Sequence, residues 1–545
     1  MRGAMTTAMR MMGNQFIAGE TISDALKNRR EFSARGFLYS CDMLGEAACT
    51  AEDAARYYQD DEAAIHAIGQ SAGNVGVYAG PGISIKLSAL HPRYSRAQKK
   101  RVMAELLPRL HALSVLARQY NIGINIDAEE SDRLDLSLDL LEALCFDPAF
   151  AGWNGIGFVI QAYQKRAPYV IDYVLDLAQR SEHRLMVRLV KGAYWDSEIK
   201  RAQVDGLADY PVYTRKVYTD LSYLACAKKL LAEPEWIYPQ FATHNAQNVA
   251  AIYHLAGHDY CAGQYEFQCL HGMGEKLYEE VTGMDKLARP CRIYAPVGSH
   301  QTLQAYLVRR LLENGANSSF VNKIAAPSMP INALIADPVD QAQAVMPLFS
   351  SHEKIPLPRA LFGTERLNSQ GLDLSNENTL IVLAAGLLSS GSQQYKAQPM
   401  LGANLPQPLN NETLKPVCNP ADHRDVVGFV QTATAQQIQA AFGGAADAQK
   451  AWQTTAVGER AACLNRCADL MEAHNAALLG LLVREAGKSL PNAIGEVREA
   501  VDFLRYYASQ ITQSFDNASH IPLGTVVCIS PWNDLCCKKW TPFCQ

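Results

Sequence analysis

Eight short apolar segments, each followed by a stretch of helical periodicity, recur through the first part of the chain and constrain its fold most strongly. Each segment has the length of a β-strand, and stretches such as Gln98–Arg118, Tyr169–Ser181 and Thr302–Glu313 predict the helices between them. The predicted strands are Phe37–Cys41, Ile83–Leu87, Ile122–Asp127, Ile156–Ile160, Leu185–Val190, Gln240–Thr243, Tyr265–Cys269 and Arg292–Ala295.

Eight such units over about 290 residues predict an α/β protein with a (βα)8 barrel, resembling the triosephosphate isomerase barrel. An open doubly wound sheet is the alternative. Its usual sign, a GxGxxG turn after the first strand, is absent from the sequence. The pattern therefore favours the barrel.

Composition narrows the class of protein. The chain has 545 residues, enough for two or three domains, and a net charge of −5, which gives no sign of nucleic-acid binding. Its 14 cysteines show no CxxC pair, and no signal peptide is recognisable, so we expect reduced thiols and a cytoplasmic protein. The longest apolar run, Thr379–Leu388, is shorter than the roughly 18 residues of a membrane span. Association with the inner face of the plasma membrane stays open.

Four regions follow from the pattern. We expect a helical leader at 1–34, the barrel at 35–325, an extension and linker at 326–410, and a second domain at 411–545. The run from Gly391 to Pro416 is dotted with prolines and is interpreted as linker. Helical patterns resume at Gln436, with amphipathic stretches at Ala461–Glu485 and Glu496–Gln510, before a strand-like segment at Gly524–Ser530.

Polar side chains gather at the carboxyl ends of the predicted strands, where α/β barrels carry their reactive groups. Polar residues are also expected wherever strand ends meet solvent. That account explains less well why Lys86, Gln161 and Arg188 lie within otherwise apolar strands, because a buried charge needs a partner or a ligand.

A predicted helix after the last strand carries Tyr306, Arg309, Arg310 and Glu313 on one face, at i, i+3, i+4 and i+7. A solvated charged face is one interpretation. Two adjacent arginines are also suited to a ligand carboxylate, since the planar guanidinium binds it through two parallel hydrogen bonds.

Five motifs follow one another along the chain and begin at Ser84 (SIKLSA), Asn125 (NIDAEE), Arg188 (RLVKGAYWD), Phe241 (FATHN) and Tyr306 (YLVRRLLENGAN). In this order they resemble the proline dehydrogenase domain of the bacterial bifunctional proline-utilization flavoenzymes. The resemblance runs from about residue 5 to 530.

The resemblance implies non-covalent FAD in the mouth of the barrel. Arg188 would lie near the reactive flavin nitrogen, where a fixed cation favours the reduced ring. The implied cofactor contacts are Val159, Gln161, Arg188, Lys191, Gly192, Ala193, Trp195, Thr243, His244, Asn245, Gln268 and Cys269. No metal site is predicted.

The resemblance also implies oxidation of L-proline to 1-pyrroline-5-carboxylate, with electrons passed to a membrane quinone. The substrate carboxylate would be held by Arg309, Arg310 and Lys86, and Glu313 would pair with Lys86. The remaining walls of the implied substrate pocket are Asp127, Tyr194, Leu270, Tyr294 and Tyr306.

Residues 411–533 resemble the beginning of an NAD-dependent glutamate-semialdehyde dehydrogenase, through Asn419-Pro-Ala-Asp, Leu482-Val-Arg-Glu-Ala-Gly-Lys and Ile529-Ser-Pro-Trp-Asn533. The nucleotide loop, general base and nucleophilic cysteine of that enzyme have no counterpart here, so we expect an incomplete second domain without its activity. We also expect no counterpart of the DNA-binding segment that longer family members carry before the barrel.

Two other functions remain open from the sequence. Lys86 or Lys191 could be the Schiff-base lysine of an aldolase, or the chain could be a catalytically silent scaffold. A visible absorbance spectrum distinguishes the flavoenzyme from the aldolase, and proline-dependent dye reduction excludes the scaffold. The oligomeric state is not indicated by any pattern.

Overall fold

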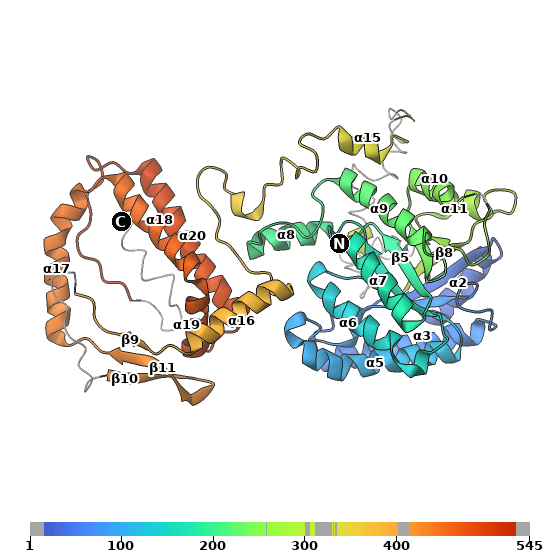
Figure 1. Ribbon diagram of the computed structural model, residues 1–545, viewed down its shortest axis with the longest axis horizontal. Coiled ribbons are helices and arrows are strands. Elements are labelled where there is room, and N and C mark those ends of the chain that lie inside the picture. The colour runs from blue at the N-terminus through green and yellow to red at the C-terminus, as the bar shows by residue number, and fades with distance from the viewer. Residues whose placement is uncertain are drawn as a thin grey trace, which may run out of the picture. The chain divides into compact units, whose positions relative to one another are not determined.

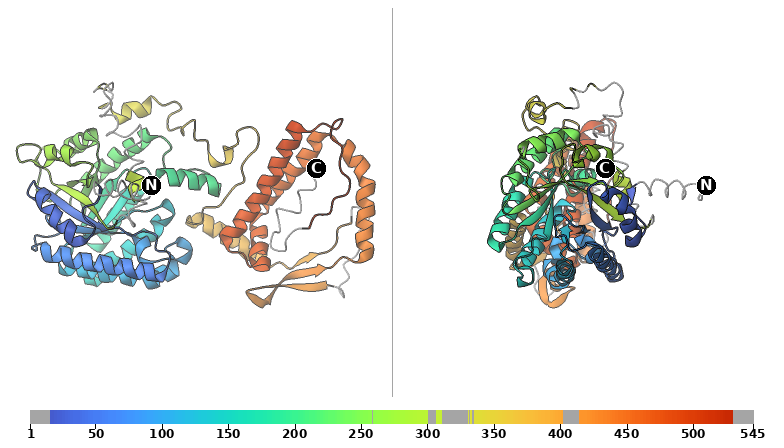
Figure 2. Two further views of the ribbon diagram at one scale, coloured as in Figure 1. Left: turned by 180° about the vertical axis from the view of Figure 1, so that it is seen from behind. Right: turned by 90° about the vertical axis from the view of Figure 1, so that its right-hand side faces the viewer.

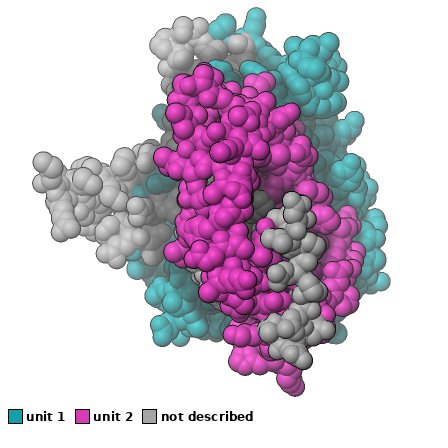
Figure 3. Space-filling model, turned by 90° about the vertical axis from the view of Figure 1, so that its left-hand side faces the viewer, with its two compact units in different colours: residues 1–199, 211–355 teal, residues 200–210, 356–545 magenta. Residues whose placement is uncertain are grey.

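The computed structural model describes residues 16–257, 259–299, 306–310, 330, 332, 335–401 and 414–529 (Figures 1 and 2). The chain divides into two compact units (Figure 3). Unit 1 comprises residues 1–199 and 211–355, and unit 2 comprises residues 200–210 and 356–545.

Unit 1 contains a closed barrel of eight parallel strands in the order β1 to β8. The barrel closes where β1 pairs with β8 along its whole length, from Phe37 opposite Cys291 to Met43 opposite Val297. The strands are β1 Phe37–Met43, β2 Gly82–Ile85, β3 Gly123–Ile126, β4 Ile156–Gln161, β5 Leu185–Val190, β6 Ile237–Ala242, β7 Glu266–Leu270 and β8 Cys291–Val297.

Helices surround these strands (Figures 1 and 2). α2 and α3 begin with capping boxes, in which Thr21 and Thr50 bind the backbone three residues later and so satisfy free N–H groups. In the described part of the chain, no helix is long and apolar enough to cross a membrane. These helices are α2 Ile22–Ser33, α3 Ala51–Ser71, α4 Leu87–Leu90, α5 Lys99–Gln119, α6 Leu134–Cys145, α7 Ala167–Ser181, α9 Lys216–Leu231, α10 Ala246–Leu255 and α11 Glu275–Thr282. Helix α8 Trp195–Asp205 begins in unit 1 and ends in unit 2, and α15 Pro338–Gln343 follows the barrel in the chain.

Side chains alternate along each strand, so that residues of the hydrophobic core and residues inside the barrel lie on opposite faces. Successive side chains of a strand point to opposite faces. In β5, for example, Leu185, Val187 and Leu189 belong to the hydrophobic core that packs against the helices, while Arg188 reaches side chains inside the barrel. A charge within an apolar strand is thus the inward member of an alternating pattern.

The predicted barrel is confirmed, and the open-sheet alternative is wrong because β1 and β8 are hydrogen-bonded neighbours. All eight predicted strands overlap observed ones, with ends that differ by at most three residues. The difference matters at β1, where the strand continues past Cys41 to Asp42 and Met43.

Unit 2 contains a small sheet and four packed helices. The sheet has the order β10-β11-β9, with β10 Leu414–Asn419 antiparallel and β9 Tyr395–Ala397 parallel to β11 Asp422–Gln431. Helices α16 Glu377–Gly391, α18 Val457–Ala473, α19 Asn475–Ala486 and α20 Leu490–Ser514 share one hydrophobic core, and α17 Ala435–Thr454 follows β11.

Three expectations about this region are wrong. The run interpreted as linker contains β9 and the start of β10, whose residues hydrogen-bond to β11. The single amphipathic stretch Ala461–Glu485 is two helices that meet at His474. Residues 524–529 are not a strand, since no described strand pairs with them.

Candidate active site

Two buried ion pairs stand at the carboxyl ends of β1, β2, β3 and β5. Lys86 Nζ donates to Asp42 Oδ1 at 2.6 Å and lies 3.6 Å from Asp127 Oδ2. Arg188 Nη1 donates to Asp127 Oδ1 at 2.7 Å. Each of these four side chains is less than a tenth exposed. The barrel therefore brings Lys86, Asp127 and Arg188 together, as expected for a site at this end.

Tyr294 on β8 joins the two pairs. Its hydroxyl donates to Asp127 Oδ2 at 2.7 Å and accepts from Lys86 Nζ at 3.2 Å. Arg188 Nη2 also donates to Ser84 Oγ at 2.9 Å. The Asp127 carboxylate is thus fixed from both sides, and it holds Arg188 in one orientation.

The charges in this cluster shift one another's pKa. Burial by itself would lower the pKa of Lys86, but the carboxylates of Asp42 and Asp127 outweigh burial and hold that pKa above its ordinary value. Burial raises the pKa of Asp42, against the pull of Lys86. Burial, followed by Asp127, raises the pKa of Tyr294. Lys86 is therefore an ammonium ion at neutral pH.

The expected partner of Lys86 was Glu313, which lies outside the described residues. The partner observed is Asp42. The sequence could have indicated Asp42. Candidate site residues were the polar residues at the carboxyl ends of predicted strands, and Asp42 meets that criterion once β1 is extended by one residue.

Residues 306–310 are helical, and their side chains face different surroundings. Arg309 donates from both terminal nitrogens to the two carboxylate oxygens of Glu46, each at 2.8 Å, and its guanidinium lies 5.3 Å from the centre of the Tyr194 ring. Arg310 is buried, with its guanidinium 5.2 Å from the centre of the Tyr306 ring. The fork of Arg309 thus already holds a carboxylate, the chemical group expected of the ligand.

The segment after β5 folds back on β4. Ala193 N donates to Gln161 Oε1 at 3.4 Å, while Gln161 Nε2 donates to the backbone oxygen of Glu129 at 2.8 Å. Gly192 has a φ of +133°, and a Cβ there would come within 2.5 Å of the Tyr163 ring, so only glycine fits. Gln161, Gly192 and Ala193, three of the predicted cofactor contacts, therefore hold one another in place.

Three further predicted cofactor contacts, Val159, Lys191 and Trp195, lie on β4 or after β5 and have other neighbours. Val159 is a buried inward residue of β4 that lines a cavity beside Gln161. Lys191 Nζ donates to Asp220 on α9, and Trp195 Nε1 donates to the backbone oxygen of Tyr213 at 2.8 Å. Both side chains are therefore tied to the segment that follows α8 rather than to the Lys86 cluster.

The ends of β6 and β7 carry the remaining predicted contacts. His244 Nε2 accepts from Leu270 N at 3.0 Å, and Thr243 Oγ1 accepts from Asn245 N at 3.1 Å. Asn245 also caps α10 by accepting from Gln247 N. These bonds fix the loop after β6 against the end of β7.

Gln268 and Cys269 lie on opposite faces of β7. Gln268 points into the barrel and donates to Glu266 at 2.8 Å. The Cys269 side chain belongs to the outer hydrophobic core, where its Sγ lies 3.8 Å from Cys291 Sγ. Only the backbone of Cys269 is therefore placed to meet a ligand inside the barrel.

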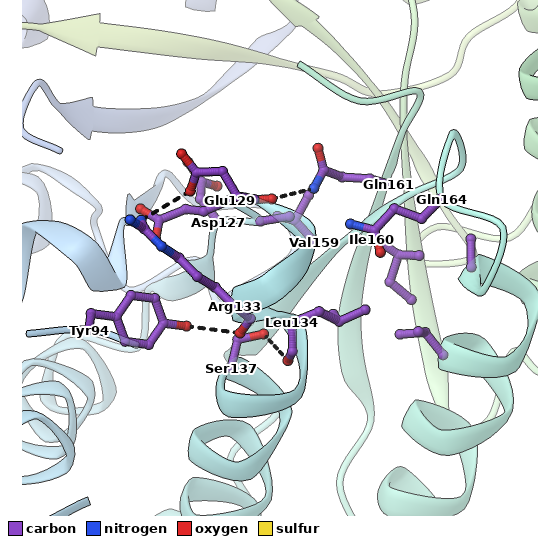
Figure 4. A pocket seen from close by; sticks show the side chains of 14 residues that line it. Tyr94, Asp127, Glu129, Arg133, Leu134, Ser137, Val159, Ile160, Gln161 and Gln164 are labelled. Carbon is purple, nitrogen blue, oxygen red and sulfur yellow. Dashed lines mark hydrogen bonds and ion pairs between the residues drawn. The ribbon is translucent and has the colours of Figure 1, made fainter. Parts of the chain in front are cut away.

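Glu129 is a buried carboxyl group at the edge of the site, beside a cavity of about 20 Å³ (Figure 4). It accepts from Ser88 and from Arg133 Nη1. Burial raises its pKa to about 7, although Arg133 and Ser88 pull it down. The cavity has room for roughly one water molecule, so it is too small by itself to hold a molecule of the size of proline.

Two sequence families match the chain. The proline dehydrogenase family matches residues 25–323, and the aldehyde dehydrogenase family matches residues 408–539. The bifunctional protein PutA of Salmonella typhimurium is 62% identical over 543 residues, which cover 98% of this chain and 40% of that protein. The chain thus spans less than half the length of this curated relative.

Solved structures agree with the sequence matches. A mutant of proline utilization A from Bradyrhizobium japonicum superposes with a TM-score of 0.79 at 46% identity, covering 93% of this chain and 48% of that one. Proline utilization A from Bdellovibrio bacteriovorus, inactivated by N-propargylglycine, gives 0.83 at 28% identity, covering 94% and 53%. The resemblance drawn from the motifs is confirmed. The match to the proline dehydrogenase family covers more than half of the residues of this chain, so the chain belongs to that family.

Proposed function

We propose that the chain oxidises L-proline to 1-pyrroline-5-carboxylate with bound FAD and passes the electrons to a quinone. The observation that carries the proposal is the buried Lys86–Asp127–Arg188–Tyr294 cluster at the catalytic end of a barrel of this family. A quinone acceptor would bring the protein to the membrane surface.

The inside of the barrel fits a flavin. Arg188 is 3% exposed, and among the described residues no hydrogen-bond partner reaches its Nε. A buried donor of this kind calls for an acceptor, which the flavin ring supplies. Gly192 lets the backbone approach closely, and Ala193 and Gln161 stand beside it. When bound, FAD would supply the acceptor for a hydride from the substrate carbon next to nitrogen.

The residues of the chain would bind and orient the substrate. Arg309 and Arg310 would hold its carboxylate, since guanidinium groups bind carboxylates through paired hydrogen bonds. Arg309 would release Glu46 to do so, because both of its terminal nitrogens bind that carboxylate in this structure. Lys86 would add a third positive charge and keep its proton, because Asp42 and Asp127 stabilise the ammonium form. Tyr194, Leu270, Tyr294 and Tyr306 would enclose the apolar part of the ring and exclude water.

The two carboxylates beside Lys86 argue against an aldolase that uses Lys86 as its Schiff-base lysine. A Schiff-base lysine must lose its proton, which requires a lowered pKa. The pKa of Lys86 is raised by two carboxylates. Lys191, whose pKa burial lowers, is bonded to Asp220. Treatment with borohydride in the presence of a carbonyl substrate would detect a Schiff base at either lysine.

The visible absorbance spectrum of the purified chain, before and after adding L-proline, tests the proposal. We expect a flavin spectrum that bleaches with L-proline but not with D-proline, and reduction of an added quinone in parallel. A folded, colourless protein that takes up no added FAD would contradict the proposal.

A further inference from the structure

Glu266 on β7 is a fully buried carboxylate that receives five hydrogen bonds inside the barrel. Its Oε1 accepts from Gln240 Nε2 and Gln268 Nε2, each at 2.8 Å, and from Arg292 Nε at 2.7 Å. Its Oε2 accepts from Arg292 Nη2 at 2.9 Å and from the Tyr238 hydroxyl at 3.1 Å. No sequence pattern singled this residue out.

The carboxylate decides the orientation of both amides. An ionised carboxylate only accepts hydrogen bonds, so the group that each glutamine turns toward it must be the NH₂ group. The carbonyl oxygens of Gln240 and Gln268 therefore point away from Glu266. Exchanging oxygen and nitrogen in either amide would set two acceptors against each other.

Gln240 is the informative residue of the two. Its side chain is 1% exposed, and no hydrogen-bond partner in the described part of the chain reaches Oε1. The register pairs Gln240 with Arg188 on one side and with Glu266 on the other. A buried carbonyl oxygen beside Arg188 is thus an acceptor that calls for a donor.

An ion pair that merely stabilises the barrel is the alternative role of Glu266. Arg292 also donates to the backbone oxygens of Gly80 at 2.6 Å and Tyr78 at 2.9 Å, so other acceptors hold it too. The side-chain amides of Gln240 and Gln268 both donate to Glu266. Glu266 therefore orients both amides in addition to pairing with Arg292.

We propose that Glu266 is a positioning residue of the flavin site, which presents the side-chain oxygens of Gln240 and Gln268 as hydrogen-bond acceptors for the cofactor. The inference rests on the proposed function, because it assigns the donor to the flavin. Gln240 becomes a further cofactor contact. The oxidised flavin ring carries one N–H group and the ribityl chain of FAD carries hydroxyl groups, so the cofactor has a donor for each of the two oxygens.

The test measures the dissociation constant of FAD, by titration of the flavin-free chain, in three variants. E266Q/R292M removes both buried charges together, so that no unpaired charge is left in the barrel. R292K keeps a positive charge beside Glu266, so the carboxylate is not left unpaired, and removes the guanidinium fork that also binds the backbone oxygens of Gly80 and Tyr78. Q240M replaces one amide by an apolar side chain of similar length. Far-ultraviolet circular dichroism checks that each variant is folded.

We expect FAD to bind about 10- to 100-fold more weakly to E266Q/R292M, since two aligned acceptors are lost, and about tenfold more weakly to Q240M. R292K should stay within about threefold of the parent chain, and its flavin absorbance maxima should not move. Equal losses in R292K and E266Q/R292M, or parental affinity in a folded Q240M, would overturn the inference alone. A parent chain that binds no flavin would overturn the proposed function and this inference with it.

Discussion

Lys86 Nζ lies 2.6 Å from Asp42 Oδ1, and the two side chains are 9% and 1% exposed. Breaking a buried pair on one side leaves a charge without its partner, which costs more than the pair itself contributes. Asp127 offers Lys86 a second carboxylate at 3.6 Å, too long for a direct hydrogen bond. Asp42 is therefore the residue on which the charged state of Lys86 depends.

Asp42→Asn should lower the free energy of unfolding of the barrel by about 3 kcal/mol. Denaturant unfolding followed by circular dichroism measures the change. Asp176→Asn is the matched control, because Asp176 pairs with Arg180 on the surface with 61% of its side chain exposed. Surface pairs contribute less than about 1 kcal/mol. A loss in D42N no larger than in D176N would contradict the assigned role of Asp42.

Arg309→Met should raise the KM for proline about tenfold or more while leaving the flavin content unchanged, since the guanidinium is assigned to the carboxylate and not to the cofactor. Steady-state dye reduction gives KM, and absorbance gives flavin per chain. Arg424→Met is the control, because Arg424 is 91% exposed in unit 2. Loss of flavin at unchanged KM would reassign Arg309 to the cofactor site.

The sequence predicted the barrel well because the fold repeats one local unit. Each strand and its helix are short, and the apolar members of each strand, such as Ile83 and Ile85 in β2, face one shared core. Positions of inward residues such as Arg188 follow from the same alternation.

Partners across the barrel could not be predicted in this way. Lys86 and Asp42 are 44 residues apart, and Arg292 and Glu266 are 26 apart, so no local period relates them. Strand β9 was missed for a similar reason. Its three residues are strand only because β11, more than 25 residues later, pairs with them. Gly524–Ile529 has the composition of a strand but no described strand beside it.

Glu129 predicts a pH dependence of stability. Its pKa in the folded chain is raised to about 7 from an ordinary value of 4.5. Between these values the folded chain binds more protons than the unfolded chain, so stability falls as pH rises from 4.5 to 7 and stays lower above 7. The total fall from this group is about 3 kcal/mol. Unfolding free energies measured from pH 5 to 8 should fall less steeply in Glu129→Gln, whose side chain cannot titrate. Identical slopes in the two chains would contradict the raised pKa.

Leu479→Ala should destabilise unit 2 and leave the flavin site intact. Leu479 is fully buried in the core shared by α16, α18, α19 and α20, and removing a buried leucine side chain costs about 2–5 kcal/mol. Every residue assigned to flavin or proline lies in unit 1. Limited proteolysis should therefore cut L479A faster within unit 2, at unchanged flavin absorbance and proline-dependent dye reduction.

Leu189→Ala is the matched variant, since Leu189 is equally buried but lies next to Arg188 on β5. We expect L189A to lose flavin, because the cavity loosens the strand that carries Arg188. Flavin loss in L479A equal to that in L189A would show that the site depends on unit 2.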